Sequence, residues 1–305
     1  MSFSADVKRE LCRTQISHRC CALAEAYGIL LFCNTFHHKE IRIVTESDGL
    51  KSRLPMLFRR AFKLDFDVKP TDEQGKGSFM IRDSEKLHRI MEAFGYEQSG
   101  EVSLHVNFGI LEEEHCRISF FRGAFLAGGS VTDPGKNYHL ELATPHLNVS
   151  RETPALMHEC DIIPKTTSRA GNHVLYFKQS EQIEDFLTVI GAPISAMEVM
   201  NAKLEKNLRG SINRRVNCDA ANLDKVVAAA QEQIEAIRIL EDRGSLADLP
   251  PKLQEAARLR AGNPELTLAQ LAELCDPPVS KSAFNHRLRK VCELSKRGGM
   301  TDSSK

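Results

Sequence analysis

The first two thirds of this 305-residue chain contain an internal repeat, and the repeat limits the possible fold more than any single motif does. Residues 79–96 (FMIRDSEKLHRIMEAFGY) match residues 175–192 (LYFKQSEQIEDFLTVIGA) at an offset of 96 positions without a gap. In both segments a short strand-like run leads into apolar residues at helical spacing. Each copy is therefore predicted to be a strand followed by a helix that is N-capped by serine (Ser84, Ser180) and closed by glycine (Gly95, Gly191).

A second pair of blocks extends the repeat towards the N-terminus. Residues 22–34 and 120–129 are predicted to be apolar helices, and the runs at 42–45 (RIVT) and 138–142 (YHLEL) are predicted to be the strands that follow them. Two blocks at nearly one offset favour duplication over its alternative, a chance similarity between generic strand–helix units. Each half is therefore expected to follow the order αββαββα.

The second of these helices continues into FLAGGSVTDPG at residues 125–135. This stretch, placed at the start of an αββαββα half, resembles the signature of the LAGLIDADG homing endonucleases. The resemblance implies that the signature helices of the two halves pack together along a pseudo-twofold axis, where only small side chains let two backbones approach. The small residues that offer such a surface are Gly123, Ala124, Ala127, Gly128 and Gly129.

The same resemblance implies one acidic residue closing each signature helix, and the two acids together hold divalent ions that activate water. In the second half this position falls on Asp133, whereas in the first half it falls on or near His38, where no acid stands. One carboxylate cannot form the hard-oxygen clamp that Mg²⁺ prefers, so the domain is predicted to be catalytically inactive, with Asp133 and His38 as remnants of an active site. Two alternatives remain: a softer metal bound by His37, His38 and Asp133, or an Asp-Pro-Gly turn as the only role of Asp133.

Composition restricts the partners of the chain. Lys plus Arg and Asp plus Glu both number 41, so any nucleic-acid surface must be local. The longest apolar run, residues 22–33, contains Glu25 and is too short to span a bilayer, and the first residues lack the apolar core of a signal peptide. We therefore expect a cytoplasmic protein with no membrane partner.

The nine cysteines are scattered, without a CxxC pair or a second Cys/His pair at zinc-finger spacing. This pattern favours small buried side chains in a reducing compartment, and we expect no metal and no cofactor. A redox or metal site at Cys20 and Cys21 is the alternative.

The last third of the chain is predicted to be helical. Residues 219–243, with apolar residues at 4-3-4-3 spacing, are predicted to form a long amphipathic helix, and the proline pair at 250–251 is expected to begin a new one. A second short helix opens at Thr267 with a capping box to Gln270, and a third covers residues 280–297.

The third of these short helices has the pattern of a recognition helix. Phe284, Leu288 and Val291 form an apolar stripe that can pack on a scaffold, and six basic residues stand in 281–297 against one acid, Glu293. In helix-turn-helix proteins, exposed Asn, Arg and Ser side chains meet base edges, while flanking Lys and Arg bind phosphates. The DNA-binding residues are predicted to be Lys281, Ser282, Asn285, His286, Arg287, Arg289, Lys290 and Arg297. A solvated basic helix on a small bundle is the alternative.

Two further features lie before or across the start of the long helix. One is the polar stretch NRRVNCDAAN at residues 213–222, for which the pattern indicates no specific role. The other is a basic cluster made of Lys203, Lys206, Arg209, Arg214 and Arg215.

Five segments, taken in order, resemble the bacterial WhiA regulator family. They are MSFSADVKREL, CCALAEAYGILL, FFRGAFLAGGSVTDPGKNYHLEL, NRRVNCDAANLDK and DPPVSKSAFNHRLRK, and together they extend over essentially the whole chain. The expected fold class is therefore α+β, with a degenerate LAGLIDADG-like domain at 1–212, whose two halves cover about 1–110 and 111–212. A linker with the long helix at 213–247 and an all-α helix-turn-helix domain at 248–305 are expected to follow.

The leading hypothesis is a non-catalytic, sequence-specific DNA-binding transcription regulator. The resemblance implies roles in cell division, chromosome segregation and, where it occurs, sporulation. The expected partners are double-stranded DNA on the nucleoid and, through the LAGLIDADG-like domain, other transcription or cell-division proteins; no small-molecule substrate is expected. The alternatives are an active metal-dependent endonuclease and a protein-interaction scaffold whose basic helix is incidental.

Overall fold

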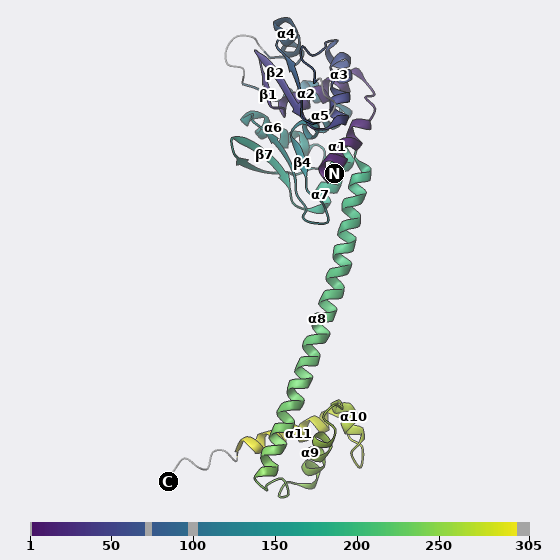
Figure 1. The fold of residues 1–305 in the computed structure, drawn as a ribbon, viewed down its shortest axis with the longest axis vertical. Coiled ribbons are helices and arrows are strands. Elements are labelled where there is room, and N and C mark those ends of the chain that lie inside the picture. Colours follow the sequence, from purple (N-terminus) through teal and green to yellow (C-terminus); the bar gives the residue numbers. More distant parts are fainter. Residues whose placement is uncertain (1, 71–74, 97–102, 298–305) are drawn as a thin grey trace, which may run out of the picture. The chain divides into compact units, whose positions relative to one another are not determined.

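The computed structural model describes residues 2–70, 75–96 and 103–297, and it divides the chain into two compact units (Figure 1). The repeat unit, residues 1–207, is α+β, whereas the C-terminal unit, residues 208–305, is helical. Helix α8 (Pro193–Asp242) contains the boundary between them. Each unit has its own apolar core, so the predicted α+β class with a separate all-α domain is confirmed. Within the described ranges, no helix is both long enough and apolar enough to cross a bilayer.

The first half of the repeat unit contains one antiparallel sheet with the strand order β1-β2-β3. Its elements are α1 (Phe3–Arg13), α2 (Arg19–Leu31), β1 (Thr35–His37), β2 (Glu40–Thr45), α3 (Asp48–Phe62), β3 (Gly77–Ile81) and α4 (Ser84–Ala93). Among the described residues of this half, the expected fourth strand is represented by an isolated bridge between Val68 and Met80. The carboxylate of Asp67 instead accepts hydrogen bonds from the backbone N–H groups of Arg82 and Asp83, and Pro70 has no N–H to continue a ladder.

The second half has the complete αββαββα order, with an antiparallel sheet in the order β4-β5-β7-β6. Its elements are the short 3₁₀ helix η1 (Phe108–Leu111), α5 (Glu114–Gly128), β4 (Gly129–Val131), β5 (Leu140–Thr144), α6 (Leu147–His158), β6 (Lys165–Arg169), β7 (Asn172–Phe177) and α7 (Ser180–Ile190). The two segments matched at an offset of 96 are strand β3 with helix α4 and strand β7 with helix α7. The sequence repeat is therefore a structural repeat.

The ends of these repeated helices agree with the prediction only in part. Gly95 and Gly191 follow α4 and α7 in the left-handed conformation, with φ of 77° and 97°, as expected of residues that close a helix. The predicted serine caps are wrong, because both serines are the first residues inside their helices. Asp83 caps α4, where its carboxylate accepts from the Lys86 N–H at 2.9 Å, since Asp is as good an N-cap as Ser and stands one position earlier.

Helices α2 and α5 lie side by side at the centre of the repeat unit and touch backbone to backbone (Figure 1). A β-carbon on Gly28 would lie 2.1 Å from the Phe120 carbonyl oxygen, and one on Gly123 would lie 2.1 Å from the Glu25 carbonyl oxygen. The two glycines stand 95 positions apart and make reciprocal contacts, as a pseudo-twofold axis requires. The predicted close packing of two small-residue helices is therefore confirmed.

A buried cluster of charges lies beside this contact. The carboxylate of Glu25, only 1% exposed, accepts a hydrogen bond from Arg53 on α3 at 2.8 Å and lies 3.5 Å from Arg122 on α5. Arg53 also donates to two carbonyl groups at the end of α1, and Arg122 donates to the Ile190 carbonyl at the end of α7. Because a buried charge is costly unless it is paired and hydrogen-bonded, this network fixes four helices around α2.

Helix α8 begins much earlier than predicted. It starts at Pro193, not at residue 219, because the intervening residues contain no helix-breaking proline and only one glycine. Its first turn is held by Glu10 of α1, whose carboxylate accepts from the backbone N–H groups of Ile194 and Ser195 at 2.8 and 3.0 Å. A carboxylate satisfies these N–H groups, which have no partner within the helix, and is favoured by the helix dipole.

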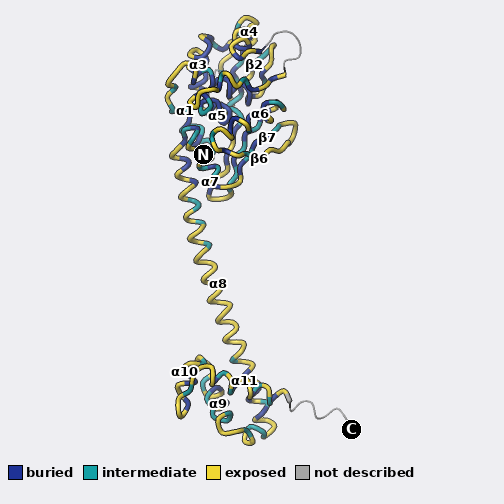
Figure 2. The backbone as a smooth tube through the Cα atoms, turned by 180° about the vertical axis from the view of Figure 1, so that it is seen from behind, coloured by how far each residue is buried: buried dark blue, intermediate teal, exposed yellow. Residues whose placement is uncertain are grey.

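Two members of the predicted basic cluster hold α8 on the repeat unit. Lys203 pairs with Glu181 of α7 at 2.6 Å. Lys206 donates to the Pro134 carbonyl at 2.7 Å and lies over the ring of Tyr138, 4.3 Å from its centroid. The polar stretch at 213–222 lies further along the helix, and all of its residues are exposed (Figure 2).

In the described part of the C-terminal unit, three helices follow α8. They are α9 (Pro251–Gly262), α10 (Leu268–Glu273) and α11 (Lys281–Arg297). The capping box between Thr267 and Gln270 at the start of α10 is present as predicted.

Replacing Gly28 or Gly123 by alanine tests the close contact of α2 with α5. Each new methyl group would overlap a backbone carbonyl that cannot move alone, so we expect a loss of about 1–3 kcal/mol or more in the unfolding free energy of the repeat unit. All four tyrosines lie in this unit and the chain has no tryptophan, so near-ultraviolet tyrosine signals in a denaturant titration report on it alone.

Gly210→Ala is the matched control, because a methyl group there meets its nearest neighbour, Arg214 Nη1, at an ordinary 3.5 Å. It should leave the tyrosine transition where it is. Gly28→Ala and Gly123→Ala transitions that coincide with the wild type would contradict the close contact.

Candidate nucleic-acid interface

Helix α11 is fixed by its apolar stripe. Phe284, Leu288 and Val291 are fully buried, as the sequence predicted. They belong to the two small cores of the C-terminal unit, with the following residues from α8, α9 and α10: Ile237, Leu240, Ala256, Ala257 and Leu271. The back of α11 is thereby held by three other helices, which leaves its opposite face to solvent.

The connection from α10 to α11 is held by Glu255 of α9. One carboxylate oxygen of Glu255 accepts from the Asp276 N–H at 2.9 Å, and the other accepts from Arg287 Nη1 at 3.0 Å. The Val279 N–H also donates to the Ala272 carbonyl at 3.0 Å, and the Ser280 hydroxyl caps the first turn of α11. A seven-residue connection without glycine therefore still has a defined path, and it sets the start of α11 against α9.

The exposed face of α11 carries most of the predicted DNA-binding side chains. Lys281, Ser282, His286, Arg289 and Lys290 are exposed, and Asn285 is half-buried beside them. Within residues 103–297, the Lys281, Arg289 and Lys290 side chains take part in no hydrogen bond or ion pair. These cations are free to meet phosphates or bases.

Two of the other basic residues are engaged inside the protein. Arg287 turns towards α9 and pairs with Glu255, while Lys296, which was counted in the basic run, pairs with Glu232 of α8 at 2.8 Å. The charge offered to a ligand is therefore smaller than the sequence count indicates. The side chain of Arg297, the last residue of α11, lies outside the described residues.

Glu255 positions α11, and nothing in the sequence analysis pointed to it. It stands 32 positions before Arg287 and 21 before Asp276, so no helical or turn spacing connects the three. The sequence gives only a weak indication of this role, namely a carboxylate on a short helix that precedes the basic helix α11.

In the repeat unit, the two remnants of an active site do not lie where the resemblance placed them. Helix α5 ends at Gly128, and Asp133 lies in the turn between β4 and β5, where its carboxylate accepts from the Gly135 N–H at 2.8 Å. His38 is exposed in the turn between β1 and β2. The expectation that they close the two helices is wrong, because the match was made by counting along the motif and the helix ends five residues before Asp133. The turn role of Asp133 is the one the structure shows.

The residues that do close the signature helices carry no carboxylate. The C-cap of α2 is Phe32, followed by Cys33, and α5 ends at Gly128 with Gly129 as its C-cap. Over the described part of the chain, His37, His38 and Asp133 do not come together as a group of metal ligands. The group that does come together lies at the opposite ends of α2 and α5 and consists of Cys20, Cys21, His115 and Cys116.

Comparisons with known proteins agree with both units. Residues 117–209 match the family model described as the WhiA LAGLIDADG-like domain, and residues 212–295 match the WhiA C-terminal HTH domain. The chain is 36% identical to the "Probable cell division protein WhiA" of Ruminiclostridium cellulolyticum, over 97% of this chain and 98% of that protein. It is also 36% identical to the protein of the same description from Desulforudis audaxviator, over 97% of each. The crystal structure of full-length DUF199/WhiA from Thermatoga maritima has the same fold, with a TM-score of 0.60 at 22% identity over 97% of this chain and 99% of that one.

Replacing Glu255 by alanine tests its hold on α11. The change removes acceptors for one backbone N–H and one partly buried guanidinium, so we expect the C-terminal unit to lose about 1–3 kcal/mol of unfolding free energy. Denaturant titration followed by far-ultraviolet circular dichroism, compared with the tyrosine signal of the repeat unit, separates the two transitions. Glu273→Ala, an exposed carboxylate on α10, should change the stability by less than about 0.5 kcal/mol. Equal effects of the two variants would count against the role of Glu255.

Proposed function

Since the chain belongs to the WhiA family, we propose that it is a sequence-specific regulator of transcription that binds double-stranded DNA through α11. The observation that supports this most directly is the cationic and polar face of α11, where Lys281, Arg289 and Lys290 have no partner among the described residues. The back of the helix is fixed by three other helices. Asn and Arg side chains can form paired hydrogen bonds with adenine and guanine edges in the major groove, and Ser can bond to either. Lys281 and Lys290 beside them are suited to phosphates, which set the position of a helix on the duplex.

The proposed roles of the predicted residues differ. Asn285 and Arg289 are proposed to read bases, with Ser282 and His286 at the same face. Arg287 is proposed to act indirectly, because its guanidinium is tied to Glu255 and orients α11. Arg297 remains a proposed phosphate contact from the end of the helix.

We propose that the repeat unit has no nuclease activity and serves as a binding surface. Its support is the absence of carboxylates at Phe32, Cys33, Gly128 and Gly129, the helix ends where such a fold needs acids to hold Mg²⁺. Partners of this unit would be transcription or cell-division proteins, or further DNA. Cell division is the role that the curated relatives carry in their descriptions, and we extend the proposal to chromosome segregation, sporulation where it occurs, and a place on the nucleoid.

Binding to genomic fragments tests the role of α11. Asn285→Ala and Arg289→Ala should each weaken binding at the preferred site by about 1–3 kcal/mol and relax its sequence preference. Lys281→Ala and Lys290→Ala should weaken binding to all sequences alike and lower the slope of log affinity against log salt by about one each. Lys225→Ala, an exposed cation on α8, is the control and should have neither effect. Affinity that is independent of salt and of sequence would instead favour the interaction scaffold.

Incubation of supercoiled and site-containing DNA with Mg²⁺ or Mn²⁺ tests the absence of catalysis. We expect no nicked or linear product, and Asp133→Ala should behave as the wild type does, because Asp133 serves a turn. Cleavage that disappears in Asp133→Ala would establish the endonuclease alternative.

A further inference from the structure

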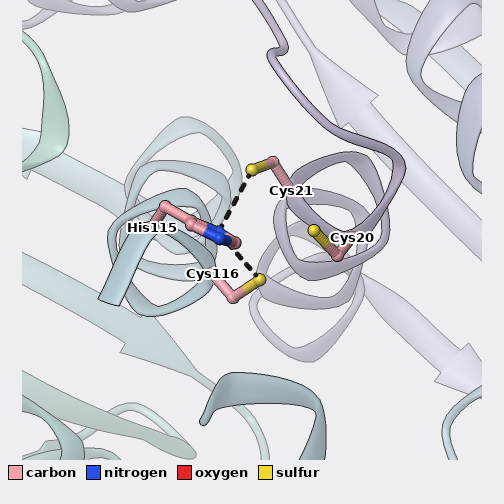
Figure 3. Close-up of side chains that lie close together, drawn as sticks. All are labelled: Cys20, Cys21, His115 and Cys116. Atoms are coloured by element: carbon pink, nitrogen blue, oxygen red, sulfur yellow. Dashed lines mark hydrogen bonds between the residues drawn. The ribbon is translucent and has the colours of Figure 1, made fainter. Parts of the chain in front are cut away.

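Four sulfur- and nitrogen-bearing side chains converge where α2 and α5 begin. Cys20 and Cys21 are the second and third residues of α2, and His115 and Cys116 are the second and third residues of α5. Figure 3 shows the two pairs facing each other across the space between the helices. Cys21 and Cys116 are buried, whereas Cys20 and His115 reach the surface.

The two pairs are related by the internal repeat. Cys20 and His115, like Cys21 and Cys116, stand 95 positions apart, which is also the separation of Gly28 and Gly123. Residues at equal positions on two helices that cross on a pseudo-twofold axis come together on that axis. The cluster is therefore a product of the duplication and not a chance meeting of surface side chains.

The spacing of the donor atoms suits one tetrahedral ion. The His115 Nδ1 atom lies 3.5 Å from Cys21 Sγ and 3.2 Å from Cys116 Sγ, and all four donor atoms lie within 4.8 Å of one another. Zinc–sulfur and zinc–nitrogen bonds of about 2.3 and 2.0 Å place the ligands of a tetrahedral site about 3.5–3.8 Å apart. The observed separations of the donor atoms, from 3.2 Å to at most 4.8 Å, are therefore close to those of such a site.

We propose that Cys20, Cys21, His115 and Cys116 bind one zinc ion that ties the beginnings of α2 and α5 together. Three thiols and one imidazole make a Cys₃His set, a closed structural type of zinc site. On binding, the three thiols release their protons to solvent, and the three sulfurs and the imidazole nitrogen each donate an electron pair to Zn²⁺. The two helix N-termini favour the thiolates, because the positive ends of both helix dipoles point at the cluster.

A buried cysteine outside this cluster has different surroundings. Cys33 is fully enclosed at the end of α2, and its thiol donates to the carbonyl groups of Leu30 and Thr35 at 3.2 and 3.3 Å. The thiols of Cys21 and Cys116 instead face the His115 ring. A thiol that a metal ion coordinates is deprotonated at neutral pH.

Metal analysis of the full-length chain, purified with a reductant and then dialysed against buffered zinc, tests the proposal. We expect about one zinc per chain, and cobalt substitution should give the thiolate-to-metal charge-transfer and ligand-field absorption of a tetrahedral sulfur-rich site. Cys20→Ser and Cys116→Ser should lose most of the zinc and the cobalt bands. Cys218→Ser, which removes an exposed thiol on α8, should keep both.

Cys20 is exposed, so Cys20→Ser keeps the packing of α2 and separates loss of a ligand from loss of the fold; far-ultraviolet circular dichroism checks this. A chelator should lower the melting temperature of the wild type and leave that of Cys116→Ser unchanged. A folded, reduced wild type without stoichiometric zinc and without cobalt bands would overturn the proposal. Zinc retained by the folded Cys20→Ser and Cys116→Ser chains would also overturn it, as would a disulfide within the cluster in the reduced preparation.

Discussion

Helices α2 and α5 meet with backbone against backbone, and most of the repeat unit depends on that contact. Gly28 and Gly123 leave no room for a side chain, so the two halves share one continuous apolar core that contains residues of both sheets. The same closeness forces Glu25 into the interior, where it is balanced by Arg53 and Arg122, and these two arginines in turn fix the ends of α1 and α7. A network with one acid between two arginines stabilises only a single arrangement of the helices, because any shift leaves a buried charge unpaired.

In the C-terminal unit, one face of α11 packs on the other helices while the opposite face stays exposed to solvent. Apolar packing of Phe284, Leu288 and Val291 fixes the rotation of α11 about its axis, and the two hydrogen bonds to Glu255 fix its start against α9. Pre-set side chains lose less conformational entropy on binding than mobile ones do, so such fixing favours recognition. The chain as a whole has equal numbers of acidic and basic residues, so attraction to a polyanion requires a local basic surface, and the proposed binding by this face should be sensitive to salt.

Periodic features of the sequence predicted the parts of the fold that periodicity determines. Four features could be predicted because each is a pattern with a regular period or a fixed spacing in the sequence. They are the repeat, the small-residue helices, the apolar stripe of α11 and the capping box at Thr267. The start of α8 was missed because the apolar residues were followed only from residue 219 onward, although the same helical spacing continues upstream in α8. The upstream apolar residues are Met197, Met200, Leu204, Leu208, Ile212 and Val216. Asp133 was misplaced because letters were matched along the motif, whereas the helix ends where its backbone turns into β4. The hydrogen bonds of Glu255 join residues far apart in sequence, and such contacts have no spacing to recognise.

Half of the cysteine cluster was anticipated only as an alternative, a metal or redox site at Cys20 and Cys21, and its other half, His115 and Cys116, was missed for a reason that follows from the duplication itself. Zinc motifs are sought as two ligands a few residues apart, but adjacent residues such as Cys20 and Cys21 acquire partners only when a second copy of their helix is placed against the first. When the two helices cross on a pseudo-twofold axis, a pair of adjacent ligands on one helix meets the equivalent pair on the other, which gives four ligands in one place. In the nucleases that this signature resembles, the two helices on this axis carry acids at their C-terminal ends. In this chain those ends carry Phe32, Cys33, Gly128 and Gly129. A soft-metal site at the N-terminal ends would use the same symmetry for stability, since an ion held by both helices opposes their separation at the point where glycine packing no longer joins them.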